Sequence, residues 1–111
     1  MILGLDVSTS KIGYCVIDDN QKLLLYGFIK FKKEPFEERA WDFFTNTLKE
    51  IDHKYKIKEV RIEEPFSMFS GGKTTAGTMS KLQRFNGMIS LTAYRCFHMI
   101  PILVPSRSAR S

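Results

Sequence analysis

Residues 1–18 read MILGLDVSTSKIGYCVID, and the pattern of this stretch sets how the sheet begins. It holds two apolar runs rich in β-forming residues, residues 2–6 and 12–18, which are joined by the polar segment 7–11. Asp6 closes the first run. After a turn at 18–20, residues 22–32 again alternate between apolar and polar side chains. The sequence therefore predicts that three antiparallel strands open the domain.

The apolar spacing then changes from that of strands to that of helices. Residues 35–55 are predicted to form a helix with a proline in its first turn. Its apolar side chains recur at helical intervals: Phe36, Ala40, Phe44, Leu48, Ile51 and Tyr55. Residues 58–63 alternate as a fourth strand, residues 75–98 form a second helix, and residues 100–104 form a fifth strand. This order predicts an α/β fold in a single domain, residues 1–111, with a five-stranded mixed sheet and helices on both faces.

Length and composition fit a globular domain with one hydrophobic core. The 111 residues are 43% hydrophobic and 26% charged. No segment approaches the roughly 20 apolar residues of a membrane span, and the N-terminus lacks the basic region of a secretory signal, so we expect a cytoplasmic protein without membrane contact. The net charge of +5 favours polyanionic partners. Cys15 and Cys96 lack metal-like spacing and are expected to be small buried hydrophobic residues.

Asp6 and Glu63 end two predicted strands that are neighbours in this topology, so their carboxylates should converge. Two unit charges about 4 Å apart repel by about 4 kcal/mol at an effective dielectric of about 20. Such a pair needs a shared proton, a basic neighbour or a cation. Carboxylate oxygens select Mg²⁺, with Mn²⁺ as a substitute. A lone aspartate at a strand end is more often a turn residue or a helix cap, and that alternative stays open at this point.

Two motifs resemble those of the RuvC family of Holliday-junction resolvases, which belongs to the ribonuclease-H-like superfamily. Residues 6–10, DVSTS, followed by IGY at 12–14, are similar to the family's opening strand, aspartate and turn of small residues. Sugar kinases and actin-like ATPases open in a similar way. Residues 61–66, RIEEPF, resemble the second motif, an Ile-Glu pair followed by an aromatic residue three positions after the glutamate. Residues 81–87 and 102–110 extend the likeness over nearly the whole chain.

The resemblance implies a ribonuclease-H-like nuclease that hydrolyses phosphodiester bonds in branched DNA by two-metal chemistry. Asp6 would bridge two Mg²⁺ ions and Glu63 would be the second ligand. Glu64 is the alternative ligand, although strand alternation points it to the other face. Phe66 matches the family's aromatic residue that contacts unstacked bases, with a core position as its alternative. The other residues expected to contact nucleic acid are polar, basic or aromatic: Ser8, Lys11, Phe69, Lys73, Lys81 and Arg84.

The chain departs from the family pattern after its second motif. The family completes its metal site with two acids from a helix after the fifth strand, yet no acidic residue follows Glu64. We therefore expect that the last helix is missing and that this polypeptide alone is weakly active or inactive. A non-catalytic module that binds DNA junctions and an RNA-processing nuclease of the same superfamily are the alternatives. A phosphotransferase would need a second, nucleotide-binding lobe, so no nucleotide cofactor is expected.

A homodimer is expected because a symmetric four-way junction needs two cuts. The predicted second helix offers a surface for it, a strip of mostly small or polar residues that would let another helix approach closely: Gln83, Gly87, Ser90 and Tyr94.

Overall fold

The computed structural model describes residues 1–64 and 76–105. The elements, in chain order, are β1 Ile2–Val7, β2 Lys11–Ile17, β3 Leu23–Lys30, α1 Phe36–Phe43, a π-helical turn Phe44–Leu48, α2 Lys49–Lys54, β4 Glu59–Glu63, α3 Ala76–Phe97 and β5 Ile102–Val104. Each predicted strand and helix is present, with ends that differ by a few residues. No helix within the described ranges is long and apolar enough to cross a membrane.

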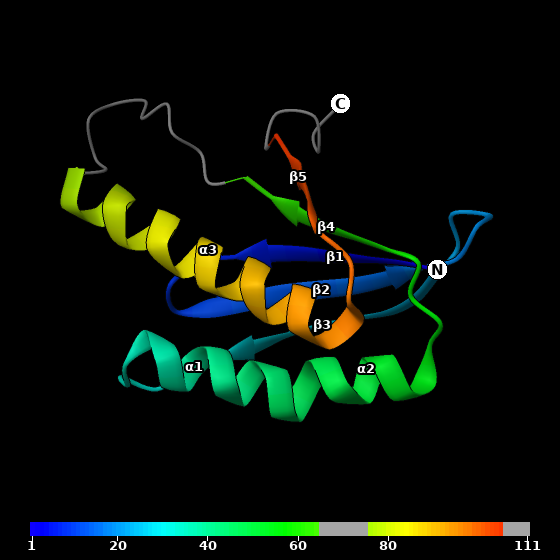
Figure 1. The fold of residues 1–111 in the computed structure, drawn as a ribbon, viewed down its shortest axis with the longest axis horizontal. Coiled ribbons are helices and arrows are strands. Elements are labelled where there is room, and N and C mark those ends of the chain that lie inside the picture. The colour runs from blue at the N-terminus through cyan, green and yellow to red at the C-terminus, as the bar shows by residue number, and fades with distance from the viewer. Residues whose placement is uncertain (65–75, 106–111) are drawn as a thin grey trace.

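The five strands form one mixed sheet in the order β3-β2-β1-β4-β5 (Figure 1). The first three strands are antiparallel neighbours, as predicted from the opening of the sequence. β4 lies parallel to β1, and β5 lies parallel to β4. The carboxyl ends of β1 and β4 therefore meet at the same edge of the sheet, which is the arrangement that the carboxylate prediction required.

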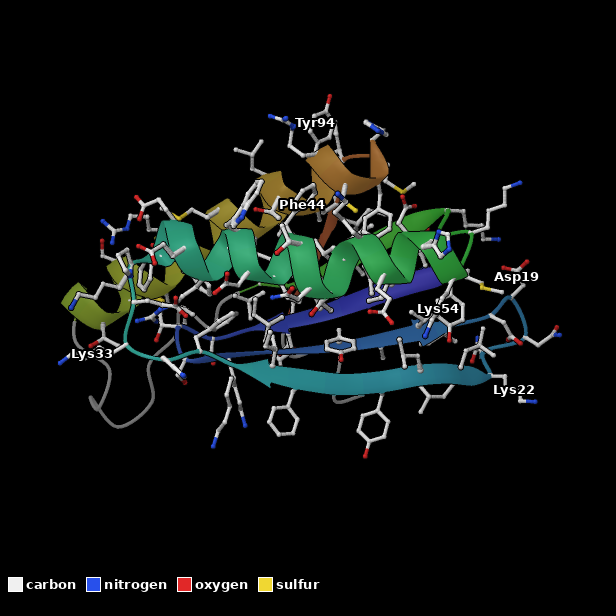
Figure 2. The ribbon with its side chains drawn as sticks, turned by 90° about the horizontal axis from the view of Figure 1, so that it is seen from below. Asp19, Lys22, Lys33, Phe44, Lys54 and Tyr94 are labelled. Atoms are coloured by element: carbon white, nitrogen blue, oxygen red, sulfur yellow. The ribbon has the colours of Figure 1, made fainter. Side chains whose placement is uncertain are left out.

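All described helices lie on one face of the sheet, where we expected helices on both (Figure 2). α3 contacts α1, α2 and the π-helical turn, so the helices form a single layer. The reason is topological. The two connections that contain helices step in the same direction across the sheet, from β3 to β4 and then from β4 to β5, and right-handed connections that continue in one direction place their helices on the same side.

The opposite sheet surface, which we call the open face, is covered by no helix within the described residues. In each strand, every second side chain points into the core, so the residues between them face this open side of the sheet. The open face carries Gly4, Asp6, Lys11, Gly13, Cys15, Tyr26, Phe28, Lys30, Arg61, Glu63, Ile102 and Val104.

The hydrophobic core lies between the sheet and the helical layer. The strands contribute Leu3, Leu5, Val7, Ile12, Val16, Val60 and Ile62, and the helices contribute Ala40, Phe43, Leu48, Ile51, Phe85, Ile89, Ala93 and Phe97. Phe85 anchors α3, with its ring 4.9 Å from that of Phe36 and 6.0 Å from that of Phe31. Full burial of each large apolar side chain contributes roughly 1.5–3 kcal/mol, so this contact fixes α3 over the sheet.

The predicted helix 35–55 contains a π-helical turn, which changes the residue that enters the core. We expected Phe44 at a core position, but Phe43 is the fully buried residue. A π-helical turn adds a residue to the helical repeat, so the buried positions Phe43 and Leu48 are five residues apart. Phe44 lies instead beside Trp41, with the ring centroids 5.7 Å apart.

Candidate active site

Asp6 and Glu63 are brought together by the parallel register of β1 and β4. Leu5 pairs with Ile62 across the two strands, and Asp6 and Glu63 are the next residues along each. Leu5 and Ile62 are buried under the helices, so the two carboxylates point to the open face. Both line one shallow hollow of about 360 Å³. The predicted convergence of these two residues is thus present in the fold.

The strand end that carries Asp6 is held by the turn that follows it. The Ser8 hydroxyl donates to the Lys11 carbonyl at 2.8 Å and accepts from the Lys11 backbone N–H at 3.2 Å. From α1, the guanidinium of Arg39 donates to the carbonyls of Thr9 and Glu34. These bonds tie the turn to the helical layer and so fix where β1 ends.

Asn86 holds the strand end that carries Glu63, and our sequence prediction missed this role. Its side chain is 5% exposed, and its amide nitrogen donates to the Glu63 carbonyl at 3.3 Å. The backbone N–H of Glu64 donates to the Val104 carbonyl at 2.7 Å on the other side. The sequence did contain a signal for this role. Asn86 follows Phe85 on the core-facing side of a predicted helix, and a buried amide needs a hydrogen-bond partner.

The two carboxylates fit one part of a site for a divalent cation. Neighbouring strands lie about 4.8 Å apart, so the paired charges favour a cation between them, and oxygen ligands suit Mg²⁺ or Mn²⁺. Arg61 lines the same hollow, but its guanidinium bonds to Glu59. In the described residues, no cluster of three or more acidic, histidine or cysteine side chains could hold a metal. Asp6 and Glu63 would therefore need ligands from outside this set.

Glu64 occupies a different position from Glu63. It follows the last residue of β4 and does not line the hollow that contains Asp6. The position of Glu64 outside the hollow agrees with strand alternation, which favoured Glu63 as the metal ligand. The metal role of either residue stays a prediction.

The residues predicted to contact nucleic acid fall on more than one surface. Lys11 lies on the open face, with its ammonium 5.5 Å from the centre of the Phe28 ring. Lys81 and Arg84 are exposed on α3 and line a groove with Thr9 beyond the end of the sheet. Ser8 closes the turn after β1. Phe66, Phe69 and Lys73 lie outside the described residues.

The two cysteines are less deeply buried than we expected. Both are free thiols at intermediate exposure. Cys15 lies on the open face, and its sulfur would be 3.0 Å from a Cβ added to Gly4. Burial raises the pKa of Cys96 from 9.0 to about 11, so this thiol is protonated at neutral pH.

Comparison with known proteins identifies the family. The sequence profile described as "Crossover junction endodeoxyribonuclease RuvC" matches residues 2–105. A relative with the same description from Aliarcobacter butzleri is 34% identical over 93 residues, which cover 81% of this chain and 56% of the relative. The chain therefore spans little more than half the length of that relative.

Solved structures of the family share the fold. The Thermus thermophilus RuvC structure in complex with a Holliday junction substrate matches with a TM-score of 0.68 and 18% identity, over 98% of this chain and 66% of that one. A second Thermus thermophilus RuvC structure matches with a TM-score of 0.59 and 18% identity, over 94% and 63% of the two chains. Taken with the profile and the curated relative, these matches show that the chain belongs to the RuvC family of crossover junction endodeoxyribonucleases.

Proposed function

We propose that this chain supplies the strand-borne half of the active site of a structure-selective DNA endonuclease that cleaves branched DNA. One observation carries the proposal: Asp6 and Glu63 stand side by side near the ends of two parallel strands, on the sheet face that none of the described helices covers. Family membership supports nuclease chemistry, and one of the structural neighbours is a RuvC bound to a Holliday junction. Such an enzyme would act in the cytoplasm of its host cell.

Each residue of the site would contribute through its position. Asp6 and Glu63 would hold Mg²⁺ through their carboxylate oxygens. Bound divalent cations lower the pKa of an attacking water and stabilise the leaving oxygen in phosphodiester hydrolysis. Asn86 would keep the Glu63 backbone in register, and Arg39 would keep the turn after Asp6 in place.

The number of carboxylates sets our expectation for activity. Because Asp6 and Glu63 form a pair and not a cluster of three or four within the described residues, we expect loose binding of Mg²⁺ and weak or absent cleavage by residues 1–111 alone. Further acids would have to come from elsewhere to complete a two-metal site.

Metal binding and cleavage should be measured separately. Mn²⁺ binding, followed by electron paramagnetic resonance, should be lost in Asp6→Asn and in Glu63→Gln but kept in Glu64→Gln. Retention of Mn²⁺ affinity by both Asp6→Asn and Glu63→Gln would overturn the assignment of these ligands. Strong Mg²⁺-dependent cleavage of a synthetic four-way junction, abolished by Asp6→Asn, would contradict the expected weak activity while supporting the nuclease itself.

Two alternatives give different results in the same assays. Junction binding that is unaffected by EDTA and by Asp6→Asn, without any cleavage, would favour a non-catalytic junction-binding module. Preferential cleavage of structured RNA in a side-by-side test with junction DNA would favour an RNA-processing nuclease.

We also propose a homodimer in which α3 contributes to the interface. Gln83, Gly87 and Tyr94 are exposed, and a Cβ added to Gly87 would meet no atom within 4 Å. The small side chain is therefore not required by packing within the described residues, which fits close approach by a second helix. Light scattering should give a dimer for the wild type and a monomer for Gly87→Leu. A monomeric wild type would contradict this proposal.

A further inference from the structure

Asp6 and Glu63 lie one residue beyond the last pair that joins their two strands. The register between β1 and β4 ends at Leu5 and Ile62. Asp6 pairs instead with a residue of β2, and Glu63 pairs with a residue of β5. These pairings hold each carboxylate from its outer side, and neither pairs one carboxylate with the other. The spacing between the carboxylates therefore depends also on how the helical layer holds the two strand ends.

The helical layer holds both strand ends through side-chain donors. In α1, the guanidinium of the half-buried Arg39 donates to the carbonyl of Thr9, three residues after Asp6. In α3, the side chain of Asn86 is 5% exposed, and its amide nitrogen donates to the carbonyl of Glu63 at 3.3 Å. Both donors act on backbone that carries or closely follows a carboxylate. A shift of either helix would therefore reach the strand end that the helix holds.

A row of aromatic rings connects these two donors. The guanidinium carbon of Arg39 lies 5.1 Å from the centre of the Phe36 ring, and the Phe36 ring lies 4.9 Å from that of Phe85. Phe85 is fully buried and directly precedes Asn86 in α3. Protein interiors are close-packed and transmit strain from one side chain to the next. Displacement of Arg39 should therefore displace Asn86 as well.

A second connection reaches Phe85 from the same turn. The backbone N–H of Phe31, the residue that follows β3, donates to the Ser10 carbonyl at 2.9 Å. The Phe31 ring meets that of Phe85 edge-on, with the ring centroids 6.0 Å apart. The turn after Asp6 is thus linked to Phe85 both through α1 and through the end of β3. The two connections make the Phe85 ring the point where movements of the turn and of α3 meet.

We infer that Arg39 and Asn86 are coupled positioning residues, and that the rings between them set the spacing of Asp6 and Glu63 as one unit. The consequence for metal binding rests on the proposed function, whereas the coupling itself requires no metal. In the competing arrangement, pairing with β2 and β5 alone fixes each carboxylate, and a change at one strand end leaves the other in place. The two arrangements give opposite results when each donor is removed in turn.

The coupling can be measured on the backbone amide signals in two-dimensional ¹H–¹⁵N NMR spectra recorded in EDTA. Arg39→Met removes the guanidinium and should displace the amide signal of Glu63. Asn86→Leu removes the amide donor and should displace the amide signal of Asp6. Displacement confined to the strand end that each side chain contacts directly would overturn the inference.

Two exposed side chains serve as matched controls. Arg95→Met removes a guanidinium from the last turn of α3, and Asn46→Leu removes an amide from the π-helical turn. Neither control should displace the signals of Asp6 or Glu63. If the controls displace these signals as strongly as the two test variants do, the effect is a general response of the fold and the inference fails.

The role of the rings can be tested by Phe85→Leu, which removes the ring where both connections meet and keeps both hydrogen-bond donors. In this background, Arg39→Met should no longer displace the Glu63 signal. Circular dichroism checks that the variant is folded. Phe36→Leu, at a half-buried position, serves if Phe85→Leu does not fold. It removes one of the two connections and should reduce the displacement. An undiminished displacement in either folded background would contradict the role of the rings.

A double-mutant cycle on Mn²⁺ affinity, measured by electron paramagnetic resonance, tests the consequence for the metal site. Loss of a group that orients a metal ligand weakens metal binding by about 10- to 100-fold. We expect a loss of about tenfold for Arg39→Met and for Asn86→Leu. The variant with both changes should also lose about tenfold if the two residues act as a unit, and about a hundredfold if they act independently. The additive result would contradict the coupling.

Failure of this inference is distinguishable from failure of the proposed nuclease. A wild type that binds no Mn²⁺ would contradict the metal site, while the NMR displacements in EDTA would still decide the coupling. Displacements confined to each strand end, together with Mn²⁺ binding that depends on Asp6 and Glu63, would overturn the coupling and leave the nuclease supported.

Discussion

Asp6→Asn should make the metal-free protein more stable. Asp6 and Glu63 lie on neighbouring strands, and two charges about 5 Å apart repel by about 3 kcal/mol at an effective dielectric of about 20. Asp6 is exposed and Glu63 is half-buried, so solvent screening reduces the expected gain to about 1 kcal/mol. A gain of this size raises Tm by about 4 °C in a domain of this length.

The assay is urea unfolding followed by circular dichroism, first in EDTA and then in Mg²⁺. In EDTA, Asp6→Asn should shift the midpoint upward without changing the slope. In Mg²⁺ at ten times its dissociation constant, the wild type should gain about 1.4 kcal/mol by linkage while the variant gains nothing. The difference between the two proteins should therefore shrink or reverse when metal is added.

A variant that is less stable than the wild type in EDTA would refute this reasoning. Glu64→Gln is the matched control, because it removes a charge one position along the chain but outside the shared hollow. The chain already has a net charge of +5, so loss of any carboxylate increases the general repulsion among positive charges. A stabilisation specific to Asp6→Asn therefore cannot come from net charge.

Two further predictions concern buried groups. Asn86→Leu removes the amide that donates to the Glu63 carbonyl, so the free energy of unfolding should fall by about 1–3 kcal/mol. Urea unfolding measures this loss beside the control Asn46→Leu, which removes an exposed amide, and equal stability of both variants and the wild type would contradict the prediction. Burial raises the pKa of Cys96 to about 11. Alkylation of Cys96 by iodoacetamide in a Cys15→Ser background should therefore be slow at pH 8, and its rate should rise about tenfold per pH unit up to that pKa. A rate that levels off near pH 9 would contradict this prediction.

The positions of the two carboxylates were more predictable from the sequence than the groups that support them. Asp6 and Glu63 were identified because each ends a strand predicted from the sequence, and the strand order then placed them side by side. Asn86 was missed because its role depends on a carbonyl 23 positions earlier in the chain. We also did not predict that Phe43, and not Phe44, would be the buried residue. The reason is that a π-helical turn leaves no distinct mark in the spacing of apolar residues.

The pattern of the sequence was enough to predict the strands, the helices and the two carboxylates near the ends of neighbouring strands. These features follow from the chain's own periodicity, in which alternate residues of a strand face opposite sides. The shared face of the described helices and the support of Glu63 by Asn86 emerged only in the tertiary structure. Such relations depend on register and on the direction of the connections, which are set by contacts between residues far apart in the chain.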